Sequence, residues 1–247
     1  MKEEKPFFIT VAILLVILVG IIVYKNVSIA LLKVEVIYDA TFNVEELRNV
    51  KFETLDSAIS IKKSEDKDIR IVLNALNKEV IYAYYNGPDL QFRYMNEEPL
   101  EGKEEFIEIY IPKDYKYNLE IQTNNGNIDF HDDLLKASVT VNTTGGDVIL
   151  SKLKNLTLKN ANGKTLVSSV TNKLSAKSIS GDIEIGVVSL KEKSNIETNS
   201  GNVEIDKTSS VYVKADSTSG NVNVNKNGTK KNITLTIKTN SGNISVN

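Results

Sequence analysis

Residues 178–185 read SISGDIEI and residues 198–205 read TNSGNVEI, so each places a glycine turn before apolar residues that alternate with acidic ones. This pattern occurs seven times in the second half of the chain, with its glycine at positions 126, 146, 163, 181, 201, 220 and 242. Successive glycines are 17 to 22 residues apart. A period of about 20 residues is typical of proteins built from stacked structural repeats.

Alignment on the glycine shows which positions of each repeat are apolar. The residues two and four after the glycine, and five and seven before it, are mostly apolar, as are Ile183, Ile185, Ala176 and Leu174 around Gly181. This alternation predicts a strand on each side of the turn, each with one buried face. One such unit cannot bury its apolar face alone, whereas units stacked about 4.8 Å apart bury a continuous core.

The third position before the glycine is polar in every repeat and shares the face of the apolar residues. Its occupants are Thr123, Thr143, Asn160, Ser178, Thr198, Ser217 and Thr239. Stacking brings such groups into register, so we expect a ladder of hydrogen bonds among them. We also expect the glycine and the Asn or Asp that follows it to form a turn that needs positive φ.

These columns predict an all-β protein with a single-stranded parallel β-solenoid over residues 118–247. The solenoid is expected to be right-handed, because parallel crossovers nearly always are. An antiparallel sandwich is the alternative, since it also uses glycine turns at short intervals. Hairpins would not need the same residue type at the same offset in seven repeats, and this favours the solenoid.

Residues 34–117 have a different composition and are predicted to form an N-terminal β module. They contain 11 basic and 18 acidic residues, a local charge of −7, and 12 of the 17 aromatic residues. One aromatic group has two interpretations, a binding patch or strand core, and core is expected for most of its members. The group consists of Tyr82, Tyr84, Tyr85, Phe92 and Tyr94.

The chain begins with a predicted membrane anchor. Residues 6–24 form a run of nineteen residues without a charge, which as a helix is roughly 28 Å long and matches the hydrocarbon thickness of a bilayer. We expect a cytoplasmic tail over 1–5, a transmembrane helix over 6–24, a juxtamembrane linker over 25–33 and an extracytoplasmic body. A cleaved signal peptide is the alternative, because Ser28-Ile29-Ala30 is an acceptable cleavage site.

Composition excludes several function classes. The 247 residues include 30 Lys and Arg, 32 Asp and Glu, one His and no Cys, with a net charge of −2. Without cysteine the chain cannot form disulfides, thiolate metal sites or a cysteine nucleophile. A globally basic nucleic-acid binder is excluded by the charge, so no nucleic-acid partner is expected.

Four short motifs suggest chemistry, and each also has a structural explanation. His131-Asp132-Asp133 suggests a metal or acid–base cluster, but a solvated turn is the simpler interpretation. Glu184 and Glu204 share one offset in adjacent repeats, which puts their Cβ atoms about 5 Å apart, the separation that retaining glycosidases use.

A solvated face with nearby lysines also accounts for the Glu184–Glu204 pair. Gly163-Lys164-Thr165 lacks the rest of a phosphate loop, and Gly145-Gly146-Asp147 lacks the tandem spacing of calcium-binding repeats. We therefore predict no catalytic, cofactor-binding or metal-binding residues.

The region from about Phe106 to Asn247 resembles the bacterial "putative adhesin" family of unknown function. The resemblance rests on the S-G-[DN]-[IV]-x-[IV] turns at 180–185 and 200–205 and on the lead-in strand IYIPKD at 109–114. An anchor followed by this domain is similar to the LiaG-like proteins linked to Gram-positive cell-envelope stress operons. The family implies an architecture and supplies no catalytic residues.

The function hypothesis is a non-enzymatic, membrane-anchored envelope protein that serves adhesion, scaffolding or an accessory role in envelope stress. The alternative is a carbohydrate-active β-helix enzyme that acts on cell-wall glycans. Expected partners are the membrane and an envelope protein or glycan. The chain stops at Val246-Asn247, so we also expect self-association through an open C-terminal rung.

Overall fold

The computed structural model describes residues 15, 17–19, 21–22, 33–76, 81–95, 104–209, 211–225, 228 and 230–247. The predicted cytoplasmic tail and cleavage site lie outside these residues, as do most of the predicted anchor and linker. The described anchor residues are helical. In the described part of the chain, no helix is both long enough and apolar enough to span a membrane.

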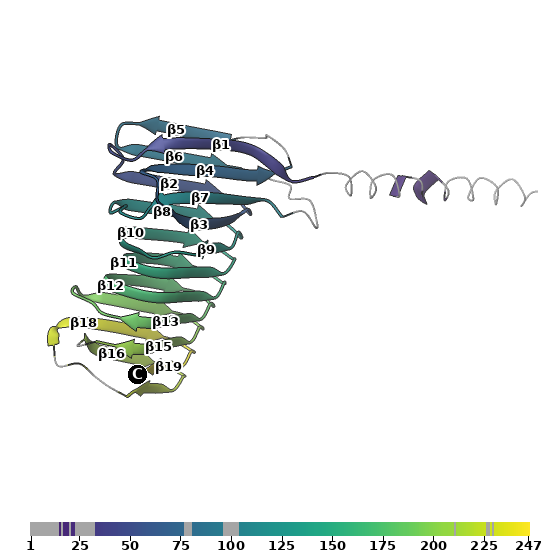
Figure 1. Cartoon of the computed structure of the whole chain (residues 1–247). Coiled ribbons are helices and arrows are strands. Elements are labelled where there is room, and N and C mark those ends of the chain that lie inside the picture. The colour runs from purple at the N-terminus through teal and green to yellow at the C-terminus, as the bar shows by residue number, and fades with distance from the viewer. Residues whose placement is uncertain are drawn as a thin grey trace, which may run out of the picture.

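The described body consists mainly of β-strands (Figure 1). The strands are β1 (Glu35–Asn43), β2 (Asn49–Thr54), β3 (Ala58–Ser64), β4 (Asp68–Ala75), β5 (Ile81–Asn86), β6 (Asp89–Tyr94), β7 (Phe106–Pro112), β8 (Asn118–Thr123), β9 (Ile128–Phe130), β10 (Leu134–Thr143), β11 (Val148–Asn160), β12 (Thr165–Ser178), β13 (Ile183–Val188), β14 (Ser194–Thr198), β15 (Val203–Thr208), β16 (Val211–Ser217), β17 (Val222–Val224), β18 (Lys230–Thr239) and β19 (Ile244–Val246). The prediction of an all-β body is confirmed.

Parallel pairing stacks the repeats into coils, each with one strand before the glycine turn and one after it. Before the turn, β8, β10 and the second half of β11 pair in parallel, so that Leu119, Val139 and Leu156 lie in one row. After the turn, β13 pairs in parallel with β12 and with β15. The parallel stack is the predicted arrangement, and the repeats do not pair as antiparallel hairpins in any described pairing.

The order of coils in space differs from their order in the sequence at the C-terminal end. Strand β18 pairs with both β14 and β16, and β19 pairs with both β15 and β17. The last coil of the sequence therefore lies inside the stack, and the β16–β17 coil forms its end. The prediction that Val246-Asn247 forms an open rung is wrong, because hydrogen bonds occupy both sides of β19.

A similar insertion occurs at the other end. The β2–β3 coil lies between the β6–β7 coil and the β8–β9 coil, and all four interfaces are parallel. Antiparallel strands then cover this end, with β5 on β6, β4 on β7 and β1 on β4. The predicted boundary between residues 117 and 118 thus lies within one stack.

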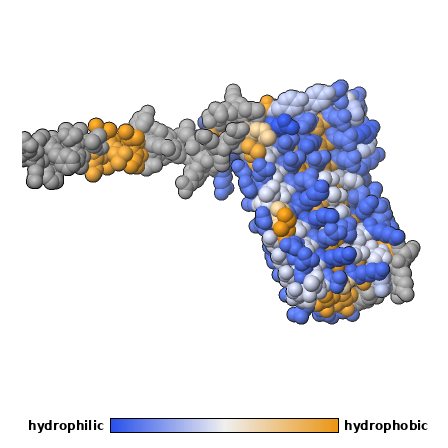
Figure 2. Space-filling view, turned by 180° about the vertical axis from the view of Figure 1, so that it is seen from behind, coloured by the Kyte–Doolittle hydropathy of each residue, from blue (hydrophilic) through white to orange (hydrophobic). Residues whose placement is uncertain are grey.

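One core runs through the whole stack. Its buried side chains extend from Leu47 to Val246 without a break at the predicted boundary. Aromatic rings such as Phe52, Phe92 and Tyr94 fill the N-terminal part, where each is fully buried, and Ile, Val and Leu fill the repeats. Figure 2 shows a mostly hydrophilic flank, with hydrophobic side chains gathered at the end of the stack where β16 and β17 lie.

The repeat glycines are required by close stacking more than by backbone conformation. A Cβ on Gly163, Gly181 or Gly201 would lie 1.8 to 2.1 Å from the carbonyl oxygen of the glycine in the preceding coil. In the same way, a Cβ on Gly242 would lie 1.9 Å from the carbonyl oxygen of Gly201, and a Cβ on Gly220 would lie 2.0 Å from that of Gly242. These glycine contacts follow the order Gly201, Gly242, Gly220 and so agree with the inserted position of the last coil.

Two predictions about the glycine turns are wrong in detail. Of the seven repeat glycines, all described, Gly146 alone has positive φ, at 85°. The polar column does not form a ladder among its own members: in six repeats the side-chain oxygen accepts a hydrogen bond of 2.8 to 3.1 Å from the glycine N–H of the same coil. The exception is Thr143, whose hydroxyl donates to the carbonyls of Asn124 and Gly145.

The ladder between coils is formed by the residue after the glycine. The side-chain oxygen of Asn or Asp there accepts from the backbone N–H of the equivalent residue in the next coil, at 2.7 to 2.9 Å. The acceptors are Asn127, Asp147, Asp182, Asn202 and Asn243. Lys164 interrupts the ladder, since its side chain cannot accept a hydrogen bond.

We predict that Gly201→Ala destabilises the protein by about 3 kcal/mol or more, because its Cβ would collide with backbone that cannot move aside. The control is Gly87→Ala, which has no atom within 4 Å of the new Cβ and suffers only from its φ of +56°, a cost of about 1–2 kcal/mol. Urea unfolding followed by circular dichroism measures both. Equal losses would contradict the stacking explanation.

The inserted coil order predicts that Val246→Ala is costlier than Val222→Ala. Val246 is fully buried although it is the penultimate residue, whereas Val222 is 43% exposed. Removing two buried methyl groups costs about 2 kcal/mol, and the exposed site should lose well under half of that. If urea unfolding showed the larger loss at Val222, the coils would follow the sequence order instead.

Candidate functional site

The structure brings Glu184 and Glu204 into register on neighbouring strands β13 and β15. They line an open hollow of 430 Å³ together with Ile149, Leu166 and Asp206. Lys164 Nζ lies 2.8 Å from Glu184 Oε1, and this hydrogen bond raises the pKa of Lys164. The Glu184 side chain is 39% exposed, whereas a glycosidase acid is held in an apolar pocket that raises its pKa.

The residues of His131-Asp132-Asp133 do not converge on a common point. His131 Nε2 lies 3.8 Å from Asp129, Asp132 accepts from the Lys63 amide, and Asp133 accepts from Lys152. Burial raises the pKa of Asp133, but the hydrogen bonds from the Lys152 side chain and amide outweigh it and leave the pKa below its usual value. Among the described residues, no three His, Cys, Asp or Glu side chains could share a metal ion.

The two glycine-rich motifs are parts of the turn column. Asp147 Oδ1 accepts a hydrogen bond of 2.9 Å from the Lys164 amide in the next coil, and Thr165 is fully buried. These contacts hold neighbouring turns together, so the groups that suggested phosphate or calcium chemistry are engaged within the stack.

The aromatic group of the N-terminal half divides into a buried part and an exposed part. Phe92 and Tyr94 are fully buried on β6, but the expectation that most of the group lies in the core is wrong, because the other three members are exposed. Tyr82, Tyr84 and Tyr85 on the edge strand β5 are 43 to 47% exposed. The sequence did not separate them, because alternation shows which residues share a face but not which strand lies at an edge.

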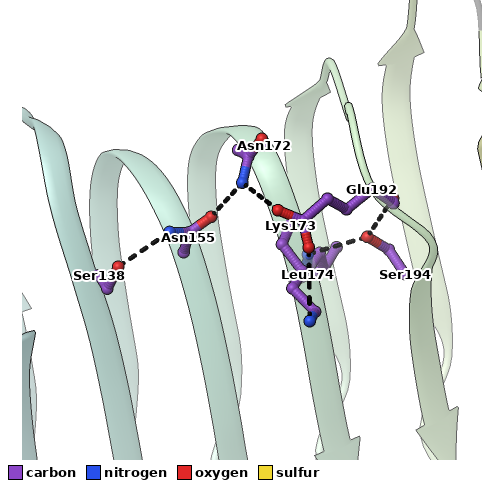
Figure 3. A network of polar contacts seen from close by, with 7 residues as sticks. All are labelled: Ser138, Asn155, Asn172, Lys173, Leu174, Glu192 and Ser194. Atoms are coloured by element: carbon purple, nitrogen blue, oxygen red, sulfur yellow. Dashed lines mark hydrogen bonds and ion pairs between the residues drawn. The ribbon is translucent and has the colours of Figure 1, made fainter.

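A row of carboxamide, hydroxyl and carboxylate groups runs along the outward rim of the strands that precede the turns. At one end, Asn49 donates to Asp89 and accepts from Asn118, at 2.8 and 2.9 Å. Farther along, Asn155 donates to Ser138, and Asn172 donates to both Asn155 and Glu192 (Figure 3). We call this set the amide row; its members are Asn49, Asp89, Asn118, Ser138, Asn155, Asn172 and Glu192. Ser138 lies beside Asn118 in the parallel register, so it joins the two parts of the row.

The amide row had a signal in the sequence. Asn118, Ser138 and Asn155 each stand eight residues before a repeat glycine, and Asn49 stands eight before Ser57. Ser57 occupies the glycine position of its coil, since a Cβ on Gly126 would lie 2.0 Å from its carbonyl oxygen. Without a glycine to mark it, the β2–β3 coil was not recognisable as a repeat.

The outward face beside the amide row is charged but balanced. Lys177 pairs with Glu197 at 2.8 Å, and Lys51 pairs with Glu120 at 3.4 Å. Exposed pairs of this kind contribute little to stability. Their alternation along the stack leaves a polar surface without a strong field of either sign.

The Toastrack DUF4097 family matches residues 47–247. The chain belongs to this family. The match begins before β2, so it includes the two coils that the repeat glycines do not mark. No curated protein matches the sequence.

Several solved structures resemble this Toastrack chain at low identity. A putative cell adhesion protein from Clostridium sporogenes is 14% identical, covers 85% of this chain and 98% of its own, and has a TM-score of 0.43. A putative adhesin from Bacteroides fragilis is 15% identical, with 85% and 96% covered and a TM-score of 0.46. A "putative lipid binding protein" from Parabacteroides distasonis is 14% identical, with 85% and 97% covered and a TM-score of 0.46.

Proposed function

We propose that this chain is a non-enzymatic, membrane-anchored protein of the cell envelope that presents the polar flank of its coil stack to other envelope components. The observation that carries the proposal is the polar flank of the coil stack, on which charged side chains such as Lys177 and Glu197 pair between neighbouring coils. Such a face suits adhesion, scaffolding or an accessory role in envelope stress, as in LiaG-like proteins. The names of the structural neighbours agree with adhesion.

Anchoring is supported by the described residues of the N-terminal segment. Leu15, Leu18 and Ile21 are helical and 58 to 59% exposed. Apolar side chains gathered on an exposed helix favour a lipid environment. Self-association stays a prediction. Because of the inserted coil order, we now expect it at the open edges of β16 and β17 and no longer at the last rung.

We predict that the full chain, tagged at Asn247 and expressed in a Gram-positive bacterium, fractionates with the membrane and is cleaved by protease added to intact cells. Leu15→Lys combined with Leu18→Lys should release it, since each charge costs about 3 kcal/mol at the centre of a membrane helix. The matched control is Leu135→Lys, an equally simple change at a site that is 52% exposed on the body.

The mass of the membrane-bound chain separates an anchor from a cleaved leader. The intact 27.4 kDa plus the tag agrees with an anchor. Recovery of the wild type in the soluble fraction, or loss of residues 1–30, would contradict anchoring.

A carbohydrate-active enzyme is the second candidate, and the hollow that contains Glu184 and Glu204 favours it. The proposal predicts that the wild type releases no reducing ends from cell-wall glycans above the level of a Glu184→Gln, Glu204→Gln double variant. A reducing-sugar assay on purified walls measures this. Hydrolysis by the wild type that disappears in the double variant would replace the binding function with catalysis.

A further inference from the structure

Two exposed tyrosines form a stacked pair at the N-terminal end of the coil stack. Tyr82 and Tyr84 project from β5 on the side that also carries Arg93 and Gln91, their partners in register on β6. Their ring centroids are 6.4 Å apart and the rings are inclined by only 6°. Asn86 donates a hydrogen bond of 2.9 Å to the Tyr84 hydroxyl, which helps to hold this ring in place.

Tyr84 of this pair borders a groove of 590 Å³ on the outward face. Tyr84 forms one wall, and Gln91, Lys51 and Glu120 project along the floor. The Asp89–Asn49–Asn118 end of the amide row closes one side. An aromatic ring beside a few fixed polar groups is the usual composition of a small-molecule subsite.

Part of the groove's polar capacity is unused within the protein. No described residue hydrogen-bonds the Gln91 amide or the Thr140 hydroxyl, and both line the groove. These groups are half-buried rather than fully solvated. They can therefore exchange water for the hydroxyl groups of a ligand.

The charged groups around the groove have a net charge of −1, because Lys51 and Arg93 face Glu53, Glu120 and Asp89. Arg93 lies 3.0 Å from Glu53, and Lys51 lies 3.8 Å from Glu53 and 3.4 Å from Glu120. Asp89 is engaged by Asn49. A polyanion such as a nucleic acid needs unpaired cations for its binding energy, so this site is unsuited to it. An uncharged ligand rich in hydroxyl groups meets no such penalty.

We propose that the groove beside Tyr84 binds a neutral polysaccharide, with a sugar ring against the Tyr84 face and hydroxyl groups on Gln91, Lys51 and Glu120. Stacking on aromatic rings gives affinity with little rotamer loss, because tyrosine has only two side-chain torsions. The inference deepens the adhesion proposal by naming a ligand class, and it requires no catalysis.

The test is isothermal titration calorimetry of the full chain in a polyoxyethylene detergent, which has no sugar headgroup to compete. The probes are chitohexaose and cellohexaose, with hexagalacturonate as the anionic comparison. We expect at least one neutral hexasaccharide to bind, and Tyr84→Ala to weaken its binding at least tenfold. Tyr84→Phe, which keeps the ring, should stay within about threefold of the wild type.

The matched control is Tyr85→Ala, since Tyr85 has the same 43% exposure but lies on the opposite face of β5 against Phe42. It should bind like the wild type, and thermal unfolding checks that every variant is folded. The inference is overturned if neither neutral probe binds, if Tyr84→Ala and Tyr85→Ala are indistinguishable, or if hexagalacturonate binds best and Lys51→Gln abolishes it. A chain that binds chitohexaose through Tyr84 but fractionates as soluble would refute the anchoring alone.

Discussion

The fold depends on the contact between one turn and the next, where the carbonyl oxygen of one coil points at the glycine Cα of its neighbour. A Cβ at any of these positions except Gly146 would approach to 2.1 Å or less, so the coils reach strand-pairing distance at the turn only because no side chain is there. The amide of each glycine except Gly146 is then satisfied within its own coil by a Thr, Ser or Asn three residues earlier. The side chain of the next residue bonds the following coil. Each turn is therefore fixed both internally and to its neighbour.

Much of this architecture follows from the sequence, because it is a property of columns. Period-2 burial on each side of the glycine predicted the strands and their parallel stacking. The predicted reason for the glycines was wrong, because only Gly146 has positive φ. The glycines are needed because a Cβ would collide with the carbonyl oxygen of the neighbouring coil. The sequence of a single repeat does not show which atoms of that coil lie close. The polar column was identified correctly, but its bonding partner was not. A hydroxyl three residues before an amide can bond locally, and this local bond prevailed over a ladder between coils.

The order of the coils could not be read from the repeats. The coil at Gly220 and the coil at Gly242 carry the same turn motif, STSGNVNV and TNSGNISV, so either could pair with β14 and β15. What separates them is the length and path of the connections and the fit of side chains between layers, neither of which appears in a repeat alignment. The β2–β3 coil was missed for a related reason, since Ser57 stands where the other coils have glycine. Tyr84 was grouped with core aromatics because an edge strand and a central strand have the same alternation.

The inserted coils explain how this stack protects its ends. In a repeat stack the stability of a coil is the sum of its own contribution and its contacts with neighbours, so an end coil has half the support of an internal one. Here the terminal coil β18–β19 has two neighbours, and the end coil β16–β17 is connected to the rest of the chain at both of its ends. If the end coil loosens, β19 therefore keeps its pairing with β15, and the open strand edges at that end belong to a coil that the chain enters and leaves.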